Sequence, residues 1–149
     1  MRILKATLTV TVSFLVLDLL WLGSIGSGIY DSTLGPLRAK DVVWVAAGLF
    51  YAQYVAVVVG FAVLPAIDLT QAAKRGLFVG WVAYGTYELT NWAVITDWPA
   101  ALVPIDITWG LFLTTACAVA GRLVAGPPPS RESKSSDPIG NAAEAAEPS

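Results

Sequence analysis

Four long apolar runs constrain the fold of this chain more than any other feature. They cover about residues 4–24, 42–66, 76–95 and 101–124, and short joints rich in glycine, proline or charge separate them. A helix needs about 20 predominantly apolar residues to cross the hydrocarbon core of a bilayer. The sequence therefore predicts an all-α integral membrane domain over residues 1–125, folded as an antiparallel four-helix transmembrane bundle.

Composition agrees with a membrane protein and excludes several other classes. Hydrophobic residues make up 56% of the chain and charged residues only 13%, whereas soluble domains carry about 25% charged residues. The chain has no histidine and one cysteine, Cys117, so we expect no disulfide, no metal centre and no cofactor. The net charge of −2 leaves no basic surface for nucleic acid. The expected partner is the lipid bilayer.

The last part of the chain, residues 126–149, differs from the rest. It reads GPPPSRESKSSDPIGNAAEAAEPS, and Ile139 is its only bulky apolar residue. Such a segment cannot bury enough apolar surface to offset the entropy lost on ordering. We expect a disordered polar tail.

The basic residues predict the orientation of the bundle. With four spans, the side that holds both termini carries seven of them, and the opposite side carries only Arg38 and Lys40. Lysine and arginine favour the cytoplasmic side, so both termini are predicted to be cytoplasmic. Trp44 and Trp98 then fall near the outer interface, where tryptophan commonly forms an aromatic belt.

Three carboxylates lie inside the apolar runs: Asp18, Glu88 and Asp106. An ionised acid at the centre of a spanning helix costs about 2.5–3.5 kcal/mol, so all three are expected to face the bundle interior or a watery cavity. Counting along each helix places all three in the outer half of the membrane. A shared polar site at one level is therefore geometrically feasible.

Residues three or four positions apart share a helix face, and several polar or aromatic residues fall beside the acids in this way. Cys117 lies late in the last run, away from the acids, and is expected to be a small buried hydrophobe. The candidate ligand-binding residues are Asp18, Trp21, Tyr51, Tyr54, Tyr84, Tyr87, Glu88, Asn91, Asp106 and Trp109.

Three functions fit these residues. The acids could bind or transport a small ligand or a cation in exchange for a proton, since burial and neighbouring like charge favour a protonated acid. Alternatively, Asp18, Glu88 and Asp106 could serve as general acid and base in an enzyme acting on a lipid or isoprenoid. In a third interpretation, the acids only hold the helices together by hydrogen bonds. Four helices enclose little volume, so a homodimer is compatible with each interpretation.

The run from about Phe14 to Gly121 resembles a bacterial family of predicted membrane proteins, domain of unknown function family 2177. The resemblance is carried by FLVLDLLWLG, AYGTYELTN, DWP and DITWG, which begin at Phe14, Ala83, Asp97 and Asp106. Where this chain has Glu88, the family pattern usually has aspartate. The resemblance implies four spans in the bacterial inner membrane, and it implies no activity.

Overall fold

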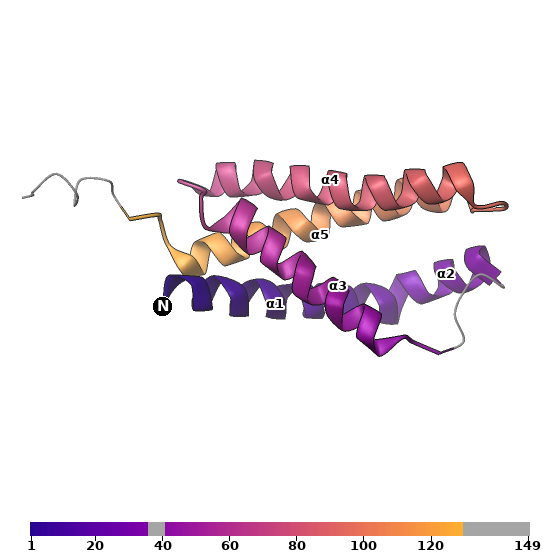
Figure 1. Ribbon diagram of the computed structural model, residues 1–149, viewed down its shortest axis with the longest axis horizontal. Coiled ribbons are helices and arrows are strands. Elements are labelled where there is room, and N and C mark those ends of the chain that lie inside the picture. The colour runs from indigo at the N-terminus through magenta and orange to yellow at the C-terminus, as the bar shows by residue number, and fades with distance from the viewer. Residues whose placement is uncertain (36–40, 130–149) are drawn as a thin grey trace, which may run out of the picture.

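The structure, a computed structural model, describes residues 1–35 and 41–129, and within these ranges every regular element is a helix. The expected disordered tail lies, from residue 130 onward, outside the described residues. The elements in chain order are α1 (Arg2–Trp21), the π-helical turn η1 (Leu22–Gly26), α2 (Ser27–Leu34), α3 (Trp44–Val57), the π-helical turn η3 (Val58–Val63), α4 (Leu69–Val94) and α5 (Leu102–Ala125) (Figure 1).

Within the described residues, three helical stretches are long and apolar enough to cross a membrane. They are Arg2–Ser24, Trp44–Val63 and Leu102–Ala125, in agreement with the first, second and fourth predicted runs. The third predicted run, 76–95, falls within α4. That helix has 26 residues, but its polar and charged side chains make it less apolar than the other three.

The prediction of a polar connection between the first two apolar runs is wrong over much of its length. We expected residues 26–41 to form a polar connection, whereas the helix continues from α1 through η1 and α2 as far as Leu34. This segment contains glycine but no proline, and glycine lowers helix stability without preventing a helix. The helix ends where Gly35 takes a positive φ of 48°, a conformation that glycine adopts at little cost.

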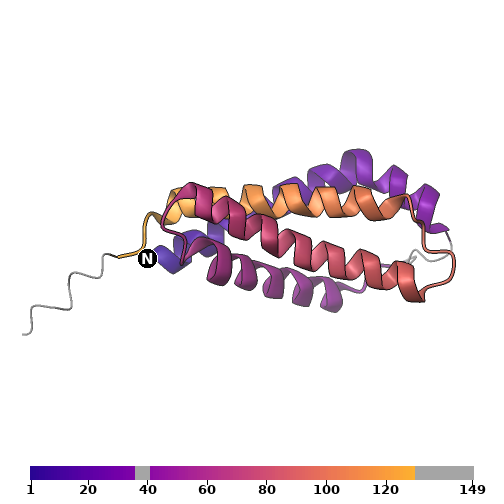
Figure 2. The ribbon, with the colours of Figure 1, turned by 90° about the horizontal axis from the view of Figure 1, so that it is seen from above.

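Helices α4 and α5 make the most extensive helix–helix contact among the described residues and lie side by side in both views (Figures 1 and 2). Small residues make this approach feasible: a Cβ atom at Gly80 would lie 2.6 Å from the carbonyl oxygen of Gly110. A Cβ atom at Gly76 would likewise lie only 2.9 Å from the Cβ atom of Ala118. Close packing of small residues is a common basis for helix association in lipid. A Cβ atom at Gly48, by contrast, would have no neighbour within 4 Å.

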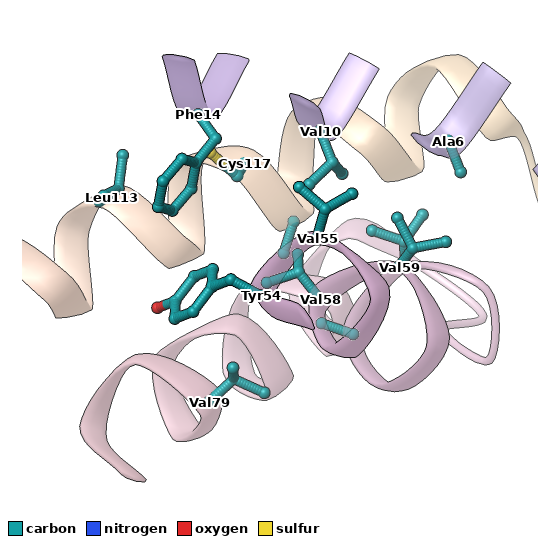
Figure 3. Close-up of a cluster of buried hydrophobic side chains, with 13 residues drawn as sticks. Ala6, Val10, Phe14, Tyr54, Val55, Val58, Val59, Val79, Leu113 and Cys117 are labelled. Atoms are coloured by element: carbon teal, nitrogen blue, oxygen red, sulfur yellow. The ribbon is translucent and has the colours of Figure 1, made fainter. Parts of the chain in front are cut away.

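A hydrophobic core joins α1, α3, η3 and α5, with one contribution from α4 (Figure 3). On α1 the buried positions Ala6, Val10 and Phe14 are four residues apart and form one stripe. They meet Leu113 and Cys117 of α5. Cys117 is fully buried, as expected for a small hydrophobe.

Three arginines bind backbone carbonyl groups at the end of the bundle that holds the N-terminus. The carbonyls belong to residues 61–67, where η3 ends and leaves acceptors unpaired. Arg122 donates from Nε to the carbonyl oxygen of Ala66 at 2.8 Å and from Nη2 to that of Ile67 at 2.7 Å. Arg2 donates from Nη2 to the carbonyl oxygen of Leu64 at 2.7 Å. Arg75 donates from Nη1 to the carbonyl oxygen of Phe61 at 3.0 Å. Cations at a helix C-terminus also interact favourably with its dipole. This end is therefore basic, and the acids of the spans lie toward the other end.

Candidate functional site

Asp106 lies on the buried face of α5, near its first turn, and is only 6% exposed. The hydroxyl of Tyr30 donates a hydrogen bond to its Oδ1 atom at 2.5 Å, and the indole N–H of Trp21 donates to the Tyr30 hydroxyl at 3.3 Å. Burial and this bond to Asp106 raise the pKa of Tyr30. Tyr30 therefore stays a neutral donor at physiological pH.

Glu88 of α4 is fully buried, and it lies close enough to Asp106 for the two carboxyl groups to influence each other electrostatically. Its Oε2 atom accepts a hydrogen bond from the indole N–H of Trp98 at 3.0 Å. Its Oε1 atom is buried and has no hydrogen-bond donor among the residues that the structure describes. A buried polar atom without a partner is uncommon and calls for a physical explanation.

Asp18 does not join this pair. Its Oδ2 atom accepts a hydrogen bond from the Tyr51 hydroxyl at 2.5 Å, and the Tyr51 ring packs edge-on against Phe14 at 5.4 Å. Of the three acids predicted from the sequence, Glu88 and Asp106 influence each other, and Asp18 is bound by Tyr51 between α1 and α3.

A partly enclosed pocket of about 240 Å³ lies against Asp106. Its walls come from α3, α4 and α5, and its lining residues are Phe50, Tyr54, Ala83, Tyr84, Tyr87 and Asp106. Asp106 is the only charged residue among them. An aromatic pocket with a single carboxyl group is suited to a small organic cation, because ring faces and negative charge both attract positive charge.

Packing holds two of these aromatic rings in place. The ring of Tyr84 occupies the space that a side chain at Gly110 would fill, since a Cβ atom there would lie 2.1 Å from the Tyr84 Cγ atom. The Tyr54 hydroxyl shares a 2.6 Å hydrogen bond with Thr114 Oγ1, and the rings of Tyr54 and Tyr84 meet edge to face at 6.3 Å. The pocket walls are therefore rigid on this side.

The other predicted site residues do not line this pocket. The rings of Trp21 and Trp109 stack at 4.5 Å with planes 12° apart, next to the Tyr30 hydroxyl. Asn91 lies beside the side chain of Tyr87. Within the described residues no group of three or more acids, histidines or cysteines could hold a metal ion.

Sequence reasoning missed three residues of the site. Trp98 was predicted to belong to an aromatic belt, but the turn that contains Asp97, with its positive φ of 62°, brings the Trp98 indole back onto Glu88. Tyr30 fell in the predicted joint, and Phe50 was not singled out because its own side chain carries no polar group. A helical continuation after Trp21 would have placed Tyr30 two and a half turns further along.

Comparison with known proteins identifies the family. Residues 3–123 match the family described as "Predicted membrane protein (DUF2177)". No curated protein and no solved structure matches the chain. Because the match covers most of the chain and the structure supplies apolar helices long enough to cross a bilayer, the protein belongs to the DUF2177 family of predicted membrane proteins.

Proposed function

We propose that the protein binds a small organic cation at Asp106 in exchange for a proton held between Asp106 and Glu88. The observation that carries the proposal is the position of Asp106, which lines the aromatic pocket on one side and meets a second buried acid on the other. This is the binding interpretation of the three that the sequence left open.

The neighbouring carboxyl groups account for the proton. Two carboxylates side by side in a buried site repel each other, so one proton shared between them is favoured. If the proton is on Oε1 of Glu88, that atom, which otherwise lacks a partner, becomes a hydrogen-bond donor. When a cation enters the pocket, its charge replaces that of the proton, and the proton is released.

The aromatic walls account for the choice of ligand. The faces of Tyr54, Tyr84 and Tyr87 would surround a positive group placed near Asp106, and cation–π attraction is strongest where water is excluded. The core below the pocket is apolar, with Phe14, Leu113 and Cys117 fully buried. This arrangement favours binding from the outer half over a continuous path through the bundle.

We also propose that α4 is a fourth span, which gives an antiparallel four-helix bundle in the bacterial inner membrane. Helix α4 would extend about 39 Å at 1.5 Å per residue, and it packs along α5. Arg2, Arg75 and Arg122 gather at one end of the bundle, which favours cytoplasmic termini. Reporter fusions to each terminus test this topology, and a periplasmic signal from either one would contradict it.

Proton release tests the proposed function directly. Purified protein in a maltoside detergent and weak buffer would be titrated with tetramethylammonium while an indicator dye follows the pH. We expect release of about one proton per bound cation. Asp106→Asn should abolish binding, whereas Glu88→Gln should still bind but release almost no proton.

A matched control is Asp97→Asn, which removes an acid from the nearby turn at a position where asparagine tolerates the positive φ. This variant should behave like the wild type. The proposal fails if the wild-type protein neither binds the cation nor releases a proton, or if Asp106→Asn does both as well as the wild type.

A further inference from the structure

The first half of α3 stands apart from the rest of the bundle. From Asp41 to Phe50 no residue is buried, and Trp44 is 79% exposed. In the view of Figure 1 the N-terminal end of α3 lies away from α4 and α5. The first buried residue of α3 is Tyr54. In a membrane, lipid would therefore surround this half of the helix.

The aromatic pocket lies where α3 separates from α4. Its rim is formed by Phe50 of α3 and Tyr87 of α4, which are 44% and 55% exposed. Its inner wall is formed by Tyr54 and Asp106, both buried. The pocket thus leads from a lipid-facing rim of two rings to a carboxyl group in the interior.

Other side chains cover the acids on their remaining sides. Tyr30, held by Trp21, covers Asp106 from α2. Trp98 covers Glu88 from the turn between α4 and α5. The rim between Phe50 and Tyr87 is exposed and therefore offers an approach to the pocket.

From this geometry we infer that the ligand is an amphiphilic cation that enters from the bilayer between α3 and α4. Its positive head would lie against Asp106, and its apolar tail would remain in lipid beyond Phe50 and Tyr87. The inference rests on the proposed function, and it adds the substrate class and the route. A ligand that came from water would instead have to fit entirely within the pocket of about 240 Å³.

A series of alkyltrimethylammonium ions tests the position of the tail. The protein would be placed in phosphatidylglycerol nanodiscs, and the midpoint for proton release would be measured from the tetramethyl to the decyl compound. Empty nanodiscs supply the partitioning of each compound into lipid. If the tail stays in the bilayer, the midpoint should fall about fourfold with each added methylene, throughout the series, in parallel with partitioning.

Two variants of α4 test the route. Ala83→Phe places a ring inside the pocket, since Ala83 lines it, and should abolish proton release by every compound. Ala93→Phe adds the same ring on an exposed part of the same helix and should leave the midpoints unchanged. Equal effects of the two variants would overturn the assigned entrance.

The outcomes separate this inference from the proposed function. If tetramethylammonium releases a proton but longer tails bring no gain, or weaken binding once the pocket is full, the lipid route is refuted while the cation site stands. If no compound of the series releases a proton from the wild-type protein, the proposed function fails and the inference falls with it.

Discussion

The indole of Trp98 is the only hydrogen-bond donor that the described part of the structure supplies to the carboxyl group of Glu88, which makes Trp98→Phe an informative change. The bond is 3.0 Å long, Glu88 is fully buried, and its second oxygen already has no donor. Phenylalanine keeps most of the ring and removes the N–H. The Oε2 atom of Glu88 would then lose its donor.

The expected cost follows from that geometry. Interhelical hydrogen bonds in membrane proteins average only about 0.6 kcal/mol. Leaving a buried acceptor without its partner costs about 1–3 kcal/mol, and more when the acceptor is charged. We therefore expect Trp98→Phe to lower the free energy of unfolding by at least about 1 kcal/mol.

The assay is equilibrium unfolding in mixed micelles with increasing denaturing detergent. Trp92→Phe is the matched control, because Trp92 is on the same helix as Glu88 and 53% exposed. The double variant Trp98→Phe with Glu88→Gln completes a cycle that isolates the interaction. If Trp98→Phe costs no more than Trp92→Phe, or if the cycle shows no coupling, the contact does not stabilise the protein and the reasoning is refuted.

Two further predictions concern the walls of the site. Gly110→Ala should destabilise the protein by about 1–3 kcal/mol and weaken cation binding, because its methyl group would displace the ring of Tyr84; chemical unfolding and the proton-release titration measure both effects. Tyr30→Phe should lower stability at about pH 9 and below, because the raised pKa of Tyr30 keeps its contribution complete below the ordinary tyrosine pKa. Above about pH 10 the unfolded chain loses this proton first, so the stability of the wild type should fall toward that of the variant.

The control for Gly110→Ala is a glycine on an exposed part of α3. Gly48→Ala meets no neighbouring atom within 4 Å and should leave stability unchanged or slightly raised, since alanine favours a helix. A loss for Gly48→Ala as large as that for Gly110→Ala would contradict the packing argument. A stability difference for Tyr30→Phe that stayed constant well above about pH 10 would show that folding does not raise the pKa of Tyr30, and would contradict the influence of Asp106.

The sequence by itself determined the class of the protein and much of its helical content. Hydropathy and run length are local properties, so the stretches around Asp18, Tyr54 and Asp106 could be predicted as apolar helices from neighbouring residues alone. The cost of charge in lipid likewise marked the acids as residues that avoid lipid. The connection after Trp21 was predicted less well, because glycine-rich segments without proline can remain helical.

Only the tertiary structure decided which acids meet. The rotation of each helix about its axis depends on side chains of its neighbours, and the small residues between α4 and α5 turn Glu88 toward Asp106. Asp18, on the same kind of helix, instead faces Tyr51. Tyr30 reaches Asp106 because the helix continues past Trp21, and Trp98 reaches Glu88 because the chain turns back after α4. Such contacts join residues as far as 76 positions apart, and no local pattern of hydropathy specifies them.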